Sequence, residues 1–241
     1  MKTTISILGL ALALGTFGCS DPAADAPKAT VGSAKPVSSA KPAASAKPAA
    51  SAAASATAAA TGDAKPADTA APSTPPAGAL SLAPGDSKIE FTGAKVTGKH
   101  EGVFEKFTGW IALEGDKPEA SKVFVEIDMS TAKTDSEKLD GHLKSKDFFE
   151  VETYPKATFT STEIKAGGDG GATHTITGNL NLHGVEKSVS FPAKITVAKD
   201  KVTAEAKFSI NRKDFNIVYA GKADDLIKDD VLIKLTISAK R

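Results

Sequence analysis

Hydrophobic and polar residues alternate along most of the chain after residue 87. In the stretch VFVEIDM, Val123, Val125, Ile127 and Met129 fall on one face and the residues between them on the other. A period of two is typical of strands with one buried face, the pattern of antiparallel sheets. The same alternation occurs in residues 176–182, 189–197, 202–210 and 231–237.

Residues that favour turns separate these runs. GGDGG at 167–171, His183-Gly184 and Lys199-Asp200 each fall between two of them, and His183-Gly184 suits a two-residue hairpin. Further runs at 88–93, 103–114 and 157–164 raise the total to about eight strands. The sequence therefore predicts an all-β fold, an antiparallel eight-stranded lipocalin-like barrel.

The polarity of the strands indicates which face of this barrel is buried. A barrel that spans a membrane turns its apolar face outward and carries aromatic girdles. This sequence has no such girdles, and charged residues interrupt the second face of every strand. We therefore expect the apolar face to line the interior. Whether that interior is packed solid or hollow is left open, because small inward residues are consistent with both.

One segment departs from the alternation. Residues 134–149, TDSEKLDGHLKSKDFF, read as a single amphipathic helix with Thr134 or Asp135 as its N-cap.

The N-terminus reads as an export signal. Lys2 provides the positive charge, and residues 5–14 form an apolar stretch too short to span a bilayer. The segment 1–18 is followed by Cys19, the single cysteine of the chain, in a context that resembles the bacterial lipobox. We expect a signal peptide of 18 residues and lipidation of Cys19, which would anchor the protein to a membrane. The alternative is an ordinary secretory signal with an incidental cysteine.

Residues 19–80 are rich in Ala, Pro, Ser and Lys, and SAKP recurs at 33, 39 and 45. Such a segment has few large apolar side chains to offset the entropy of ordering, so we predict a disordered, semi-extended spacer between the anchor and a domain at 81–241. Contact of its lysines with peptidoglycan or anionic lipid is the alternative. The expected location is the periplasm or the outer membrane of a bacterium, as an exported lipoprotein.

The charge and the motifs exclude several functions. A formal net charge of +1 does not favour nucleic-acid binding. The four histidines lack the spacing of a zinc site, and the sequence contains no nucleophile elbow, HExxH motif or P-loop. We therefore predict no catalytic residues, no metal and no cofactor other than a bound lipid.

Five stretches together resemble the YceI-like family in order and spacing. They are FEKFTGWI (104–111), VEIDMSTAKTD (125–135), LDGHLKSKDFFEVETYPKATFTST (139–162), ITGNLNLHGVEKSV (176–189) and NRKDFNI (211–217). Bacterial members of that family are exported lipocalin-like barrels with an amphipathic helix, and they bind long polyisoprenoid chains inside. The resemblance implies the same fold and ligand class here, with Phe148 and Phe149 under the helix and against the lumen.

The inward strand positions and the resemblance together give a set of candidate ligand-binding residues in the lumen. They are Phe91, Phe107, Ile111, Val125, Ile127, Phe148, Phe149, Phe159, Leu180, Phe191, Ile195, Phe208 and Ile210. Arg212, in the family's Arg-x-Asp-Phe pattern, is a possible head-group contact for a phosphate or carbonyl, with a salt bridge or strand-end cap as the alternative. The family carries a histidine near the position of His100, at a different spacing, which makes His100 the second head-group candidate.

The predicted function is to bind, sequester or transport a long apolar lipid, such as a polyisoprenoid, a quinone tail or a fatty amide. Two alternatives stay open: a ligand-free interaction or structural protein, and an enzyme that acts on a lipid held in the barrel. The oligomeric state is undetermined at this point, with a homodimer among the options.

Overall fold

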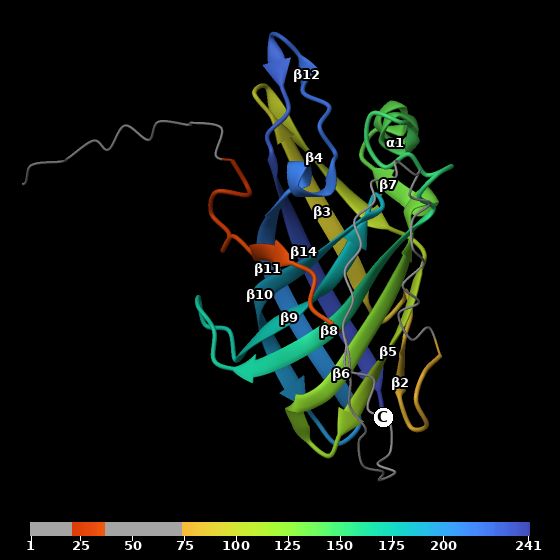
Figure 1. Ribbon diagram of the computed structural model, residues 1–241, viewed down its shortest axis with the longest axis vertical. Coiled ribbons are helices and arrows are strands. Elements are labelled where there is room, and N and C mark those ends of the chain that lie inside the picture. Colours follow the sequence, from red (N-terminus) through yellow and green to blue (C-terminus); the bar gives the residue numbers. More distant parts are fainter. Residues whose placement is uncertain (1–20, 37–73) are drawn as a thin grey trace, which may run out of the picture.

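The computed structural model describes residues 21–36 and 74–241. The described part is mostly strand with one α-helix, which confirms the predicted all-β class, and its wall has nine long strands where eight were expected (Figure 1). The signal peptide and Cys19 lie outside the described residues, so both stay predictions.

A strongly curled antiparallel sheet forms the wall of the molecule. Its neighbours run in the order β5-β6-β8-β9-β10-β11-β14-β3-β4. The run at 103–114, expected to be one strand, is two strands, because the chain turns at Glu105 and Lys106. The bounds are β3 (Lys88–Lys95), β4 (Gly98–Phe104), β5 (Phe107–Glu114), β6 (Lys117–Asp128), β8 (Lys156–Ala166), β9 (His174–Leu182), β10 (Val185–Val197), β11 (Lys201–Asn211) and β14 (Asp230–Lys240).

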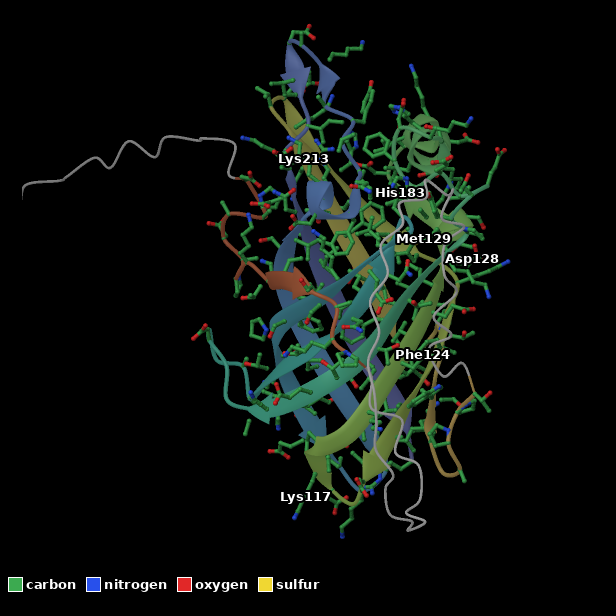
Figure 2. The ribbon with its side chains drawn as sticks, viewed as in Figure 1. Lys117, Phe124, Asp128, Met129, His183 and Lys213 are labelled. Atoms are coloured by element: carbon green, nitrogen blue, oxygen red, sulfur yellow. The ribbon has the colours of Figure 1, made fainter. Side chains whose placement is uncertain are left out.

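Short strands hold the two edges of this sheet together. At one end of the barrel, β2 (Leu80–Leu82) pairs with β5, and the Ser87 hydroxyl donates to the Ser238 carbonyl 3.1 Å away on β14. At the other end, β6 continues through η1 (Met129–Thr131) into β7 (Ala132–Thr134), which pairs with β4. Figure 2 labels Lys117 and Asp128, the first and last residues of β6, at these opposite ends.

The helix α1 (Glu137–Lys144) covers the barrel end where β6 finishes, which we call the helix end. The predicted N-cap is wrong: Ser136 is the cap, and Thr134 is the last residue of β7. The reason is the Asp140 carboxylate, which accepts hydrogen bonds of 2.6 Å from both the amide and the hydroxyl of Thr134. These bonds hold Thr134 in the strand and delay the start of the helix.

The connections between strands follow the turn signals closely. His183 and Gly184 both have positive φ, and they join β9 to β10 as the expected two-residue hairpin. A long connection joins β11 to β14 at the helix end and contains η2 (Arg212–Phe215), β12 (Gly221–Lys222) and β13 (Asp225–Leu226). No helix of the described residues is long and apolar enough to cross a membrane.

Residues 21–36 differ from the disordered spacer that composition predicts for this part of the chain. They include β1 (Thr30–Ser33), which pairs with β10 on the barrel wall (Figure 1). The partners that satisfy the backbone of β1 belong to strands more than 150 residues further along the chain. Composition alone carries no signal of such a distant pairing. Residues 21–36 therefore differ from the prediction because tertiary contacts with the barrel order them.

Candidate functional site

The barrel encloses an apolar cavity of about 260 Å³. It extends from Ile111, Val123 and Ile237 in the half away from α1 to Leu143 and Phe148 at the helix end. Among the described residues that line it, Arg212 is the one charged side chain. The interior is therefore hollow, and the choice that the sequence left open is decided by the packing.

The surroundings of three glycines show which parts of this interior are filled and which are empty. A Cβ added at Gly102 would lie 2.3 Å from the ring of Phe91, and one added at Gly178 would lie 2.4 Å from the ring of Phe159. These two rings therefore occupy the space that the glycines leave. At Gly93, which lines the cavity, an added Cβ would meet nothing within 4 Å. The space beside Gly93 is part of the cavity.

Most of the predicted lumen residues do line the cavity. Phe107 and Ile195 are not among the lining residues: Phe107 is buried against Phe104 and Met129, and Ile195 packs at the edge of the core cluster around Phe191. The predicted residues that line the cavity are Phe91, Ile111, Val125, Ile127, Phe148, Phe149, Phe159, Leu180, Phe191, Phe208 and Ile210.

Several lining residues are absent from the predicted set. Met129, Ile176 and Val189 occupy inward positions of predicted strands, so the alternation contained the signal for them. Ile217 and Ile227 lie in the long connection between β11 and β14, where no periodic pattern marks them. Their place in the wall depends on how that connection folds over the barrel end.

Aromatic rings cluster where the helix meets the barrel. The centroid of Phe149 lies 6.5 Å from that of Phe91 and 6.1 Å from that of Phe104. Phe148 is buried against Leu143 and Ile217. Tyr154 lies outside the cavity lining and stacks edge-on against His183, with 4.7 Å between the ring centroids. The two phenylalanines thus form part of the cavity wall, and Tyr154 supports the β9–β10 turn.

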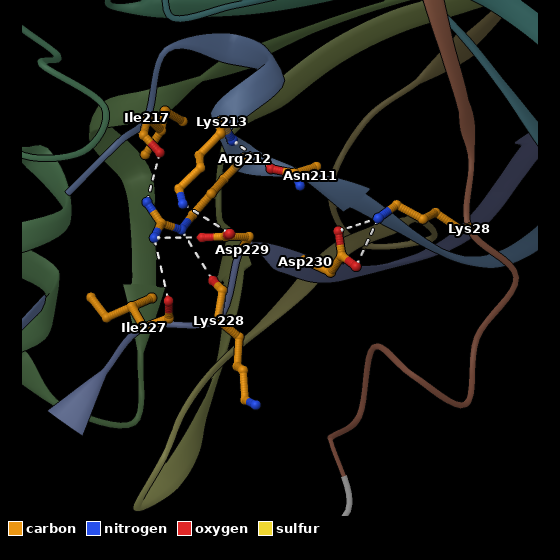
Figure 3. A network of polar contacts seen from close by, with 9 residues as sticks. All are labelled: Lys28, Asn211, Arg212, Lys213, Ile217, Ile227, Lys228, Asp229 and Asp230. Atoms are coloured by element: carbon orange, nitrogen blue, oxygen red, sulfur yellow. Dashed lines mark hydrogen bonds and ion pairs between the residues drawn. The ribbon is translucent and has the colours of Figure 1, made fainter. Parts of the chain in front are cut away.

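The Arg212 guanidinium is buried at the end of β11 and makes four hydrogen bonds (Figure 3). It donates to the carbonyl oxygens of Ile217, Ile227 and Lys228 at 2.6, 3.4 and 3.1 Å, and to the Asp229 carboxylate at 3.2 Å. Burial lowers the pKa of Arg212 from its ordinary value, and Asp229 partly opposes this shift. Most of its donors are therefore used to hold the connection between β11 and β14 together.

His100, the other head-group candidate, lies on the rim and does not line the cavity. Its Nδ1 is 2.8 Å from the Asp135 carboxylate, and both side chains are exposed. Within the described ranges, no group of three or more His, Cys, Asp or Glu side chains is arranged to hold a metal ion.

Comparison with known proteins places most of the chain in one family. The sequence profile of the YceI-like domain matches residues 80–239. A UPF0312 protein of Pectobacterium atrosepticum is 40% identical over 122 residues, and a UPF0312 protein of Yersinia enterocolitica is 38% identical over 122 residues. Each match spans 48% of this chain and 62% of the relative's length.

Solved structures share the same fold. BcnA of Burkholderia cenocepacia superposes with a TM-score of 0.56 at 25% identity, over 64% of this chain and 96% of BcnA. A polyisoprenoid binding domain from Saccharophagus degradans superposes with a TM-score of 0.54 at 16% identity, over 67% of this chain and 98% of that domain. The second likeness concerns the fold alone.

Proposed function

The chain belongs to the YceI-like domain family, and we propose that it binds a long apolar lipid inside its barrel. The observation that carries the proposal is the cavity of about 260 Å³, whose lining is apolar apart from Arg212. Small-molecule sites are concave and mostly apolar, with few polar groups to fix orientation.

The volume of the cavity indicates how much of a lipid chain it accepts. A water molecule takes about 30 Å³ of the liquid, so the space corresponds to roughly eight or nine waters, or a similar number of chain carbons. Each buried methylene contributes about 0.8 kcal/mol, which gives about 7 kcal/mol before the entropic cost of binding. The affinity for a lipid then comes from burial of its hydrocarbon chain, so the protein distinguishes poorly between different apolar tails.

We further propose that the ligand is of the polyisoprenoid, quinone-tail or fatty-amide class. A cavity without a free charged group favours a lipid whose head stays outside or is uncharged, because a buried charge needs a partner. The Saccharophagus domain, described as polyisoprenoid binding, has the same fold. The role in the cell that we propose is sequestration or transport of this lipid in the envelope, with the protein tethered through Cys19, as the N-terminal sequence predicts.

The test fills the cavity without straining the wall. Gly93→Leu places a side chain into open space, so we expect thermal stability to be kept and affinity for added polyprenol to fall at least tenfold. Gly141→Leu is the matched control, because Gly141 is exposed on α1 and its added Cβ also meets nothing within 4 Å. This control is expected to bind as the wild type does.

A second measurement uses protein purified from its host. An organic extract of the purified protein should contain stoichiometric lipid, detected by mass spectrometry. The proposal fails if repeated extracts contain none and the protein takes up no polyprenol. It also fails if Gly93→Leu binds polyprenol as tightly as Gly141→Leu does.

A further inference from the structure

Strands β10 and β11 separate part of the way along the barrel. In the part of the chain that the structure describes, their ladder covers the four pairs from Lys194↔Glu205 to Val197↔Val202. Nearer the helix end, residues 27–33 lie between the two strands, and we call them the inserted strand. It pairs antiparallel with β10 from Thr30↔Ser190 to Ser33↔Lys187 and forms a parallel bridge with β11 at Lys28↔Ser209.

Backbone hydrogen bonds join the inserted strand to β11 as well as to β10. The Ala29 amide donates to the Ser209 carbonyl at 2.8 Å, and the Ser209 amide donates to the Pro27 carbonyl at 2.9 Å. These bonds satisfy groups of β11 that β10 no longer reaches. The inserted strand is therefore one strand of the barrel wall, in a slot between two strands of the domain.

The inner face of the inserted strand packs against residues that line the cavity. Ala29 is buried in the same core cluster as Val189, Phe191, Phe208 and Ile210, and all four of these residues line the cavity. The direct β10–β11 ladder ends at Lys194↔Glu205, and three residues further along each strand the rings of Phe191 and Phe208 stack with 4.2 Å between their centroids. From there towards the helix end, the inserted strand takes the place of direct β10–β11 pairing, and Ala29 is its buried side chain.

Apart from its backbone hydrogen bonds and the buried Ala29, the inserted strand is held by two side-chain interactions. Lys28 pairs with Asp230 at 2.8 Å, and the two side chains are 58% and 35% exposed (Figure 3). The Asn179 side chain accepts from the Lys35 amide and donates to the Lys35 carbonyl, at 3.0 and 2.6 Å. Exposed ion pairs stabilise little, and segments with few buried apolar contacts open at low free energy. The inserted strand buries only the small side chain of Ala29 in the core cluster, whereas its neighbours β10 and β11 bury phenylalanine rings there.

We propose that the slot between β10 and β11 is a lateral entrance to the cavity, and that the inserted strand closes it reversibly. This inference rests on the proposed lipid binding and adds the route by which the lipid passes. When the inserted strand leaves, Val189 and Ile210 become accessible from the side of the barrel, and a hydrocarbon chain can contact the cavity lining without passing under α1. Its return restores the backbone hydrogen bonds and seals the chamber.

A disulfide lock tests this route. Thr30 and Ser190 are directly opposed in the ladder, and opposed residues of antiparallel strands have Cα atoms about 4.5–5.5 Å apart, within the range of a disulfide. The variant is the full chain with Thr30→Cys and Ser190→Cys, and Cys19→Ser prevents mispairing. We expect uptake of the fluorescent fatty acid trans-parinaric acid to slow at least tenfold when oxidised and to recover with dithiothreitol.

The matched control locks a seam that is continuously paired. Thr203 and Ser238 are opposed in the β11–β14 ladder, so Thr203→Cys with Ser238→Cys, again with Cys19→Ser, repeats the same residue types. Its uptake rate should equal that of Cys19→Ser alone. Equal uptake by the oxidised and reduced Thr30–Ser190 lock overturns the lateral entrance and leaves lipid binding intact. No uptake by any variant overturns the proposed function as well.

A variant with the opposite effect makes the test independent of disulfide formation. Lys28→Glu places a second carboxylate beside Asp230 and should speed uptake at least threefold, whereas Lys199→Glu in the distant β10–β11 turn should not.

Amide hydrogen exchange gives a further readout. The Ser209 amide should exchange at least tenfold faster than the amides of the β11–β14 ladder, and exchange at the rate of global unfolding would overturn the proposal.

Discussion

The two sides of β11 differ in the way they are paired. On one side, eleven consecutive residue pairs join it to β14, from Lys201↔Lys240 to Asn211↔Asp230. On the other side, four pairs join it to β10, and the inserted strand supplies the remainder. The same strand is thus an ordinary member of a continuous ladder on one side and the edge of a slot on the other. A barrel wall can therefore combine a permanent seam with one that depends on a separate segment.

The largest expected effect concerns the connection that follows the permanent seam. Arg212→Ala removes the donor for the buried carbonyl of Ile217 and the partly buried carbonyls of Ile227 and Lys228, and it also removes a buried side chain. A buried acceptor left without a donor costs roughly 1–3 kcal/mol. We expect the free energy of unfolding to fall by about 4 kcal/mol or more in urea titrations. Arg212→Lys should recover part of this loss. Full stability of Arg212→Ala would show that the connection does not depend on this guanidinium.

A pair of matched substitutions compares the two seams directly. Ala206 and Ala29 are buried in the same core cluster, one on β11 and one on the inserted strand. Ala206→Asp should lower the free energy of unfolding by about 3 kcal/mol, because the carboxylate is buried without a partner. Ala29→Asp should cost less than about 1 kcal/mol, since its segment can leave the slot. Equal costs in urea titrations would remove the distinction between the seams.

The short β4–β7 ladder provides a third case, in which a charged side chain supports the pairing. Lys133 and the hydrogen bonds from Thr134 lower the pKa of Asp140 from its ordinary 3.8 to about 2. A pKa lowered by folding stabilises the fold above about pH 4, and this contribution is lost as the pH falls towards 2. Asp140→Asn should therefore be less stable than the wild type at pH 7. Its stability should also vary less between pH 4 and pH 2, measured by thermal unfolding at each pH.

The smallest expected effect is that of Lys28→Ala. Its ion pair with Asp230 is exposed, and such pairs contribute about 0–1 kcal/mol. We expect a change in global unfolding free energy within about 0.5 kcal/mol, and less with added salt. A loss above 2 kcal/mol in urea titrations would show that the inserted strand unfolds together with the whole barrel.

Much of the wall could be predicted from the sequence, because alternation reports directly which face of a strand is buried. Alternation, together with the family resemblance, predicts Val125, Phe159 and Phe208 to lie in the lumen, and all three line the cavity. Phe107 follows the same alternation and still misses the cavity, since alternation gives the face of a residue and not its distance from the empty space. Ile227 lines the cavity but could not be predicted, because it lies in the connection between β11 and β14, where hydrophobic and polar residues do not alternate.

The inserted strand could not be predicted from local pattern. Its sequence contains one β-branched apolar residue, Val31, among small and polar neighbours in a low-complexity context. Its conformation depends on unpaired edges of β10 and β11 that form only when the barrel does. Arg212 illustrates the same limit, since its acceptors come from four positions in the β11–β14 connection and the sequence could not separate a structural role from a ligand contact.

The docking of β1 changes the topology of the Ala- and Pro-rich region. With β1 fixed to β10 and β2 fixed to β5, the residues between them are joined to the domain at both ends. While β1 stays docked, a lipid on Cys19 would be linked to the barrel wall by the seven residues 20–26. Such a tether spans at most about 25 Å when fully extended. The Ala- and Pro-rich repeat would then not lengthen the tether between the lipid and the barrel. Release of β1 would add more than fifty residues to that tether. The same release would therefore open the slot and allow the barrel to move away from a membrane that holds the lipid.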